Sequence, residues 1–178
     1  MKNNSIINKK IPILIDISIL IVLLIYMLCS YKAVRPSVYE PDFEEVQVIA
    51  NGNGFEAGID GASITAKGSK PFLELKGWAI QTNVNSTKFN KKKLVLRNAE
   101  TGEYVSVPTE IETRTDISDL KYDGCDYIQS GFRAKAYTDN LINPDCYTYD
   151  ILVLYNTSTG QKLIETGMTL NTFIYREE

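Results

Sequence analysis

The sequence predicts an all-β protein, with an antiparallel β-sandwich domain behind a single N-terminal transmembrane helix. Three observations lead to this prediction. A long apolar segment lies near the N-terminus, the rest of the chain alternates in character with a period of two, and turn-forming residues separate the alternating segments. Because no convincing amphipathic helix interrupts them, short strands at this spacing favour a sandwich, with a barrel as the alternative.

Residues 11–31 form the apolar segment, and they match the roughly 20 residues that a helix needs to cross a bilayer. Their isoleucines, leucines and valines each favour insertion by about 0.3–0.6 kcal/mol, and together they outweigh the roughly 3 kcal/mol cost of one central acid. The segment contains one acid, Asp16, near its start. We interpret Asp16 as a polar residue at the membrane surface; the alternative is a contact for a partner within the bilayer.

The charges that flank the apolar segment predict its orientation. The flanking basic residues are Lys2, Lys9 and Lys10 before the segment and Lys32 and Arg35 after it. Since positive charge favours the cytoplasmic side, we expect residues 1–10 in the cytoplasm, a single span in the cell membrane, and an extracytoplasmic domain. A cleaved signal peptide or a lipoprotein is the alternative, which the large residues before Cys29 disfavour.

Beyond the membrane segment, the chain divides into a linker and a domain. Residues 32–54 contain two prolines, an acidic run and the turn-forming Asn51-Gly52-Asn53-Gly54, so we expect an extended linker, with a short strand possible at 46–50. Residues 55–178 are numerous enough to bury a core of their own. In this domain we expect strands near 72–79, 94–96, 104–107, 132–137 and 149–155 and one helical turn near 117–121.

The composition excludes several classes of site. The chain has no histidine, and its 19 basic and 22 acidic residues give a net charge of −3. Histidine-dependent catalysis and histidine-ligated metals are therefore excluded, and the slight acidity argues against a nucleic-acid partner. Since nucleotide-binding and hydrolase motifs are also missing from the sequence, we expect a protein that is not an enzyme and needs no cofactor.

The three cysteines, Cys29, Cys125 and Cys146, form no C-x-x-C pair. A disulfide between Cys125 and Cys146 would suit an oxidising compartment. An expected strand over residues 127–137 would separate them by about 33 Å, whereas bridged Cα atoms lie within about 7 Å. We therefore favour free thiols and keep the disulfide as the alternative.

A series of short motifs runs through the expected domain in a fixed order. They are Lys76-Gly77-Trp78-Ala79, Lys93-Leu94-Val95-Leu96, Tyr104-x-x-x-Pro108, Arg114-x-Asp116-Ile117, Ser130-Gly131-Phe132 and Tyr147-x-x-Asp150-Ile151. This order resembles the β-sandwich modules found beside catalytic domains of bacterial cell-envelope glycosyltransferases and teichoic-acid-type polymerases. The resemblance covers residues 59–168. It implies a sandwich fold with an accessory role in the cell envelope, and no catalytic residue carries over from it.

One concentration of basic residues offers a contact for an anionic envelope polymer such as teichoic acid. It consists of Lys88, Lys91, Lys92, Lys93 and Arg97. On an acidic domain this local exception would attract a polyanion. The alternative is a lysine-rich hairpin loop that keeps a sheet edge soluble.

Aromatic side chains offer a second kind of contact, because their faces pack against sugar rings. The candidates for sugar stacking are Tyr122, Tyr127 and Tyr147. Trp78 lies between Gly77 and Ala79 in the most apolar expected strand, so we expect it to pack in the core.

Two groups of acids are candidates for chemistry. Asp116, Asp119, Asp123 and Asp126 suggest a calcium site, although their spacing does not match a calcium-binding loop and capping of local backbone is the favoured interpretation. Glu110 and Glu112 lie two residues apart, on one face of a strand, and would suit a carboxylate-based hydrolase. We favour a solvated strand face for this pair.

Together these features predict a membrane-anchored, non-catalytic binding or accessory module for the assembly of envelope polysaccharide or teichoic acid. The alternative is a structural or interaction protein that docks onto another membrane protein through its sandwich and its helix. Glycan binding by the domain would indicate the first function. A partner that is lost when the helix is exchanged would indicate the second.

Overall fold

The N-terminal unit of the chain is a single helix, α1 (Asn4–Ala33). The computed structural model describes residues 4–67, 70–87, 90–121, 123–138, 141–170 and 174–176, and it divides the chain into two compact units, Met1–Val34 and Arg35–Glu178. The 30 residues of α1 extend over about 45 Å at 1.5 Å per residue. Its portion Asp16–Ala33 is long and apolar enough to cross a membrane, and all of its side chains are exposed. A membrane anchor and a signal sequence both have these properties.

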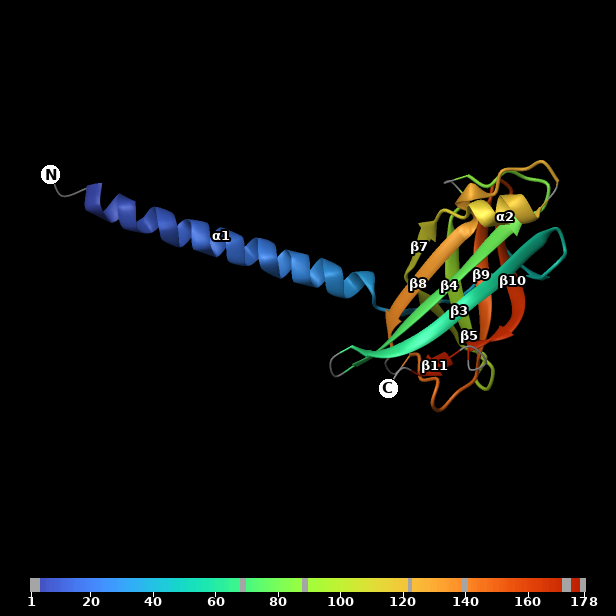
Figure 1. Ribbon diagram of the computed structural model, residues 1–178. Helices are drawn as coiled ribbons and strands as arrows, with labels where there is room; N and C mark the ends of the chain where they lie inside the picture. Colours follow the sequence, from blue (N-terminus) through green and yellow to red (C-terminus); the bar gives the residue numbers. More distant parts are fainter. Residues whose placement is uncertain are drawn as a thin grey trace. The chain divides into compact units, whose positions relative to one another are not determined.

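The second unit is mostly β, with strands arranged in two sheets (Figure 1). The six-stranded sheet has the order β1 (Ser37–Val38), β6 (Tyr104–Val107), β5 (Lys92–Asn98), β9 (Tyr149–Thr157), β10 (Gly160–Thr169) and β2 (Val46–Ala50). The five-stranded sheet has the order β11 (Ile174–Arg176), β3 (Phe55–Lys67), β4 (Lys70–Gln81), β8 (Gly131–Tyr137) and β7 (Thr109–Glu112). Most neighbours are antiparallel, but the edge pairs β2–β10 and β3–β11 are parallel. The sequence indicated antiparallel pairing throughout, and these two parallel pairs correct that prediction.

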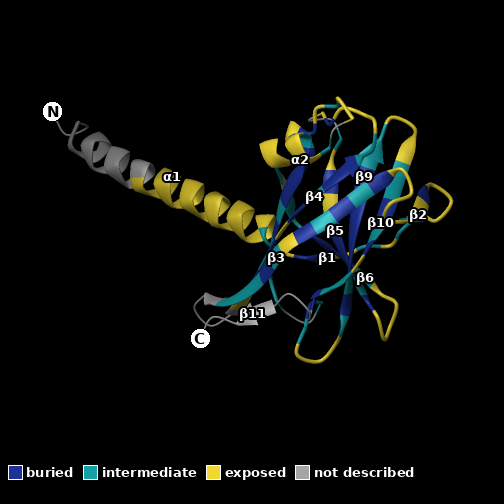
Figure 2. Ribbon diagram, turned by 45° about the vertical axis from the view of Figure 1, so that its right-hand side comes forward, coloured by how far each residue is buried: buried dark blue, intermediate teal, exposed yellow. Residues whose placement is uncertain are grey.

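The inner faces of the two sheets contribute to one apolar core. Side chains alternate along each strand, so Leu73 and Leu75 of β4 and Leu94 and Leu96 of β5 enter this core, and all four are fully buried. The central strands β5 and β9 are accordingly buried along most of their length (Figure 2). A β-rich chain with two sheets and one N-terminal apolar helix is therefore confirmed.

Seven of the residues 32–54, which we expected to form an extended linker, belong to two strands of the six-stranded sheet. They provide β1 at one edge and β2 at the other. The segment 39–45 between these strands crosses the outer face of the sheet, where the Tyr39 N–H donates to the Tyr104 carbonyl at 2.9 Å and the Phe43 ring meets the Tyr104 ring edge-on at 6.2 Å. At its end, Val46 is buried in a second apolar cluster on that outer face.

Two short helical elements lie at one end of the unit, α2 (Thr115–Leu120) and the 3-10 turn η1 (Ile128–Ser130) (Figure 1). The expected helical turn near 117–121 is thus confirmed, shifted by two residues. Since η1 occupies residues 128–130, β8 begins only at Gly131 and is shorter than the strand 127–137 that the disulfide argument used.

Trp78 lies in a different place from the one we expected. It is partly buried, but it packs on the outer face of the five-stranded sheet with Ile80, Ile117 and Tyr127, outside the main core. Because side chains alternate along β4, the neighbours of Trp78 face the core and its indole faces outward. The indole lies over Gly58, where a Cβ atom would come within 2.7 Å of it.

Cys125 and Cys146 are free thiols. Cys125 lies between α2 and η1, and Cys146 lies in the loop before β9. The seven residues of β8, about 20 Å long, lie between them in the chain. The strand between them is shorter than the 33 Å that the sequence predicted, but it separates the two cysteines for the same physical reason.

Candidate functional site

Two hollows lie at opposite ends of the six-stranded sheet. We call the first the basic hollow; its volume is about 300 Å³, and it is lined by Lys91, Lys92, Lys93, Thr109, Leu154, Asn156 and Gln161. We call the second the tyrosine hollow; its volume is about 170 Å³, and it is lined by Val38, Asn98, Thr101, Glu103, Tyr104, Val105, Leu141, Tyr147 and Tyr149. Strand β5 runs from one to the other, because it begins at Lys92 and ends at Asn98. Its rise places the two hollows about 20 Å apart.

The basic hollow contains three of the five predicted polymer-contacting residues, but they are not equivalent. Lys91 and Lys93 are exposed, whereas Lys92 keeps only 4% of its surface accessible. The cause is the alternation of β5: Lys92 lies on the same side of the strand as the core residues Leu94 and Leu96. Lys91 and Lys93 therefore provide the positive charge that an external ligand can reach.

The Lys92 ammonium is held inside the domain. Its Nζ donates to the carbonyl oxygens of Asn90 at 3.1 Å and Gln129 at 2.6 Å, and it lies 5.1 Å from the centre of the Tyr155 ring. Burial lowers its pKa to about 8. The prediction that Lys92 contacts a polymer is therefore wrong, because its ammonium is bound by backbone carbonyls that join β5 to η1.

Arg97 is also committed within the protein. Its guanidinium pairs with Asp150 at 2.8 Å and with Glu165 at 3.0 Å, and the hydrogen bond to Asp150 is the main cause that raises its pKa. Both partners come from neighbouring strands of the same sheet, β9 and β10. Two carboxylates around one guanidinium leave a local net charge of −1. A group with this surrounding charge does not attract an anion, so the prediction that Arg97 contacts the polymer is corrected. Lys88 lies outside the described residues.

Two amide side chains complete the basic hollow, and the sequence analysis missed both. Asn156 and Gln161 are cross-strand partners in the β9–β10 hairpin. The Oδ1 atom of Asn156 is buried and has no hydrogen-bond partner among the described residues. The Ser158-Thr159-Gly160 turn was a usable signal, because a hairpin brings together the residues on either side of its turn.

The tyrosine hollow contains one of the three predicted stacking residues. Tyr147 lines it with 41% of its surface exposed, beside Tyr104 and Tyr149. Tyr149 is nearly buried, and its hydroxyl accepts from the Asn143 N–H at 3.0 Å. Burial raises the pKa of Tyr149. The sequence analysis missed Tyr104 and Tyr149; the strand pattern around 104–107 and 149–155 marked their positions but not their convergence.

Tyr127 is not a stacking residue. It is fully buried, its hydroxyl donates to Asp123 Oδ2 at 2.5 Å, and the same hydroxyl accepts from the Asn83 N–H at 2.9 Å. Burial, followed by the Asp123 hydrogen bond, raises the pKa of Tyr127. Its ring supports the cluster beneath α2, so no sugar can reach it. Tyr122 lies outside the described residues.

Three of the four aspartates considered for calcium bind groups of the protein itself. Asp123 accepts from the Cys125 N–H at 3.0 Å, and Asp126 accepts from the Ile128 N–H at 2.8 Å. Asp116 pairs with Arg114 at 2.6 Å, and this pairing lowers the pKa of Asp116. Within the described ranges no group of three acids, cysteines or histidines is placed to hold a metal. These contacts favour the interpretation as backbone capping and ion pairing.

Glu110 and Glu112 lie on one face of β7, as the two-residue spacing predicted. Glu112 pairs with Arg133 of β8 at 2.7 Å, and Glu110 is exposed. This face belongs to a row of charges on the outer side of the five-stranded sheet, to which Glu74 and Lys76 also contribute. The arrangement is that of a solvated strand face.

The comparisons with known proteins add no family. No protein-family model matches the chain, no curated protein is significantly similar to it, and no solved structure matches its fold.

In chemical terms, the two hollows differ. The basic hollow offers two ammonium groups and two amides, which suit an anion with nearby hydroxyl groups. The tyrosine hollow offers aromatic faces with a carboxylate at its rim, which suit a ring that carries hydroxyl or amine groups.

Proposed function

We propose that this chain is a membrane-anchored, non-catalytic binding module of the bacterial cell envelope, which holds an anionic polysaccharide or teichoic acid during its assembly. Its C-terminal unit is then an antiparallel β-sandwich with two parallel edge pairs. Helix α1 is the anchor, with the N-terminus in the cytoplasm and the sandwich outside it. The motif resemblance to envelope glycosyltransferase and polymerase modules is consistent with this role.

The two sheets support the sandwich architecture, because one core draws on the inner faces of both. The flanking charges support the orientation: three lysines precede the apolar segment and two basic residues follow it. The length of α1 exceeds the roughly 30 Å of a bilayer core, so the helix can span with a tilt or with its ends in the headgroups.

The observation that carries the ligand class is the basic hollow. Lys91 and Lys93 present two exposed ammonium groups on either side of a strand position whose own lysine is buried. The polyanion would pair with both, and the Gln161 amide that lines the hollow would contact a sugar or glycerol hydroxyl. No step of this function requires a bond to be made or broken, so a hydrolase role for Glu110 and Glu112 forms no part of the proposal.

The test is a titration of the full chain, in detergent micelles, with poly(glycerol phosphate) at low and at physiological salt. The double variant Lys91→Gln/Lys93→Gln should lower the affinity about tenfold at low salt and less at physiological salt. The matched control is Lys76→Gln/Lys135→Gln, which removes the same charge from the five-stranded sheet and should leave the affinity within about twofold. Equal losses from both double variants, or no binding by the unaltered chain, would contradict the proposal.

The alternative function, docking onto another membrane protein, is favoured by exposed apolar side chains in β2 and in the segment just before it. Phe43 and Val48 are 60% and 39% exposed. Asp16, exposed on α1, would help that helix associate. Exchange of residues 11–31 for an unrelated span tests this alternative. A co-purified membrane protein that is lost on exchange supports docking, and one that is retained contradicts a role for the helix.

A further inference from the structure

We propose that the tyrosine hollow is a second binding site, which takes a sugar residue that carries a protonated amine. The site lies at the end of the six-stranded sheet away from the basic hollow. Its aromatic faces provide a platform for the sugar ring, and its carboxylate selects the ammonium group. The inference deepens the proposed function by adding a ligand class, and it uses residues that do not line the basic hollow.

Three tyrosines from two parts of the chain line the hollow: the rings of Tyr147 and Tyr104 are accessible, and the buried Tyr149 supports them from behind. Tyr104 begins β6, Tyr149 begins β9, and Tyr147 lies in the loop before β9. Tyr149 is fixed by hydrogen bonds of its hydroxyl with the Asn143 N–H and the Leu141 carbonyl. Tyr147 is the most accessible of the three, so its ring is the one a ligand meets first. Aromatic faces also attract cations that lie over them.

A tight turn holds the carboxylate at the rim. The buried Asn98 accepts the N–H groups of Glu100 at 2.9 Å and Thr101 at 3.1 Å through its Oδ1 atom. This turn brings Glu103 back beside Asn98, whose N–H donates to the Glu103 carbonyl at 2.9 Å. The Thr101 hydroxyl donates to Glu103 Oε2 at 3.3 Å, which leaves Oε1 for a ligand among the described contacts. Glu103 is thus positioned before any ligand arrives.

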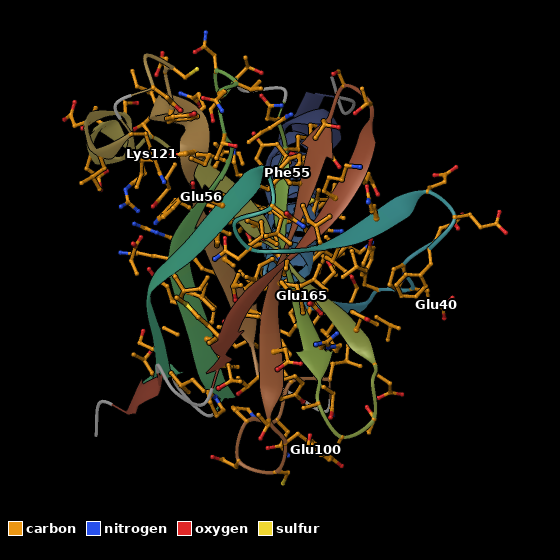
Figure 3. The ribbon with its side chains drawn as sticks, turned by 90° about the vertical axis from the view of Figure 1, so that its right-hand side faces the viewer. Glu40, Phe55, Glu56, Glu100, Lys121 and Glu165 are labelled. Atoms are coloured by element: carbon orange, nitrogen blue, oxygen red, sulfur yellow. The ribbon has the colours of Figure 1, made fainter. Side chains whose placement is uncertain are left out.

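A second glutamate ties the turn to the opposite wall. The Glu100 carboxylate accepts the Thr148 N–H at 3.2 Å and 3.3 Å, next to Tyr147. Figure 3 shows Glu100 at this end of the domain, opposite the end that carries Lys121 and Glu56. The contact sets the spacing between the turn and the tyrosine loop, and it adds negative charge close to the rim.

The charge around the tyrosine hollow is negative. Among the described residues that line it there is no lysine or arginine. Arg97 is the cross-strand partner of Tyr104, and its guanidinium is neutralised by Asp150 and Glu165. A neutral sugar would gain only from the rings. A sugar with an ammonium group gains from the rings and from Glu103, so the site discriminates in favour of the amine.

The test compares three monosaccharides with the full chain in detergent micelles at mildly acidic pH, where the amine is protonated. The probes are glucosamine, N-acetylglucosamine and glucose, and binding is followed by saturation transfer from the protein to the sugar in NMR. We expect glucosamine to bind on the order of 1 mM and the two neutral sugars at least about fivefold more weakly. Equal binding of glucosamine and N-acetylglucosamine, or binding of neither, would overturn the inference.

Variants assign the discrimination to particular residues. Glu103→Gln keeps the shape and removes the charge, so it should lower glucosamine affinity about fivefold and leave glucose unchanged. Tyr147→Ala should weaken all three sugars. The matched control Glu110→Gln removes one exposed charge from β7 and should leave the affinities for all three sugars unchanged. The double variant Lys91→Gln/Lys93→Gln should leave them unchanged as well. If the unaltered chain binds glucosamine but not poly(glycerol phosphate), the proposed function alone is contradicted. An unchanged glucosamine affinity in Glu103→Gln would contradict this inference alone.

Discussion

The two ends of strand β5 differ in charge and in the way the chain builds them. The first end presents Lys91 and Lys93, the outer two of three consecutive lysines. The second end gathers three tyrosines and a glutamate from two segments more than forty residues apart in the chain. The run of lysines was visible in the sequence, so sequence analysis could point to the first end but not to the second. The comparison also shows that such a run overstates a site, because the alternation of the strand buries Lys92 between its two exposed neighbours.

The largest expected effect separates the buried lysine from an exposed one. Lys92→Ala should lower the free energy of unfolding by about 2–4 kcal/mol, because it removes packing in the core and leaves the carbonyls of Asn90 and Gln129 without their donor. Lys91→Ala, one residue away but exposed, should change it by at most about 0.5 kcal/mol. Urea unfolding of the full chain measures both, and similar values for the two variants would contradict the assigned roles.

The next effect separates the two predicted stacking tyrosines. Tyr127→Phe should lower the free energy of unfolding by about 1–2 kcal/mol, since it leaves the Asp123 carboxylate and the Asn83 N–H without a shared hydroxyl. Tyr147→Phe keeps an exposed ring and should cost at most about 0.5 kcal/mol. The midpoints of thermal unfolding compare them. If Tyr147→Phe lowered the unfolding midpoint as much as Tyr127→Phe, the Tyr147 hydroxyl would be as important to the fold as that of the buried Tyr127, which would contradict the different roles assigned to the two tyrosines.

A pH dependence follows from the lowered pKa of Lys92. Burial moves this pKa from 10.5 to about 8, so between these values the unfolded chain binds a proton that the folded chain does not. The free energy of unfolding must then rise by about 2 kcal/mol as the pH increases from 8 to 10. Well below pH 8 both states are protonated, so this lysine adds no pH dependence there.

Buried tyrosines act in the opposite direction at higher pH. The pKa values of Tyr127, Tyr149 and Tyr155 are raised by burial, so above about pH 10 the unfolded chain loses protons first and stability falls. Subtracting the pH profile of Lys92→Met from that of the unaltered chain removes this common contribution. A difference that stays flat between pH 8 and pH 10 would contradict the burial of a titrating ammonium.

The smallest effect concerns the ion pairs between the two ends. Arg97→Gln should lower the free energy of unfolding by about 0.5–1 kcal/mol at low salt, because Asp150 and Glu165 then face each other without a cation. These groups are about one-third exposed, so the loss should shrink at high salt. Chemical unfolding at two salt concentrations measures it. An effect that grows with salt would show that the pairs are not the cause.

Local pattern was sufficient for much of the fold. The periodicity placed β4, β5, β6, β8 and β9 within a few residues, and the apolar segment lies within α1. The same periodicity, applied residue by residue, would have separated Lys92 from Lys91 and Lys93 and would have turned Trp78 away from the core. Those two errors came from judging a side chain by its neighbours in sequence, although alternate residues of a strand share a face.

Other features depended on pairing between distant segments. The neutralisation of Arg97 requires the register of β9 and β10 against β5, which no local signal contains. The parallel edge strand β2 is specified by its contact with β10, more than one hundred residues later, so residues 46–50 suggested only a possible strand. The tyrosine hollow is likewise a product of convergence, and its residues were unremarkable one by one.

The most direct test of the account is an amide NMR map of the isotope-labelled full chain in micelles, titrated separately with poly(glycerol phosphate) and with glucosamine. The account predicts that the polymer shifts the amides of Lys91, Lys93 and Gln161, and that glucosamine shifts those of Thr101, Glu103 and Tyr147, each leaving the other end unchanged. Both ligands perturbing the same end, or shifts confined to the outer face of the five-stranded sheet, would contradict the assignment of two oppositely charged sites.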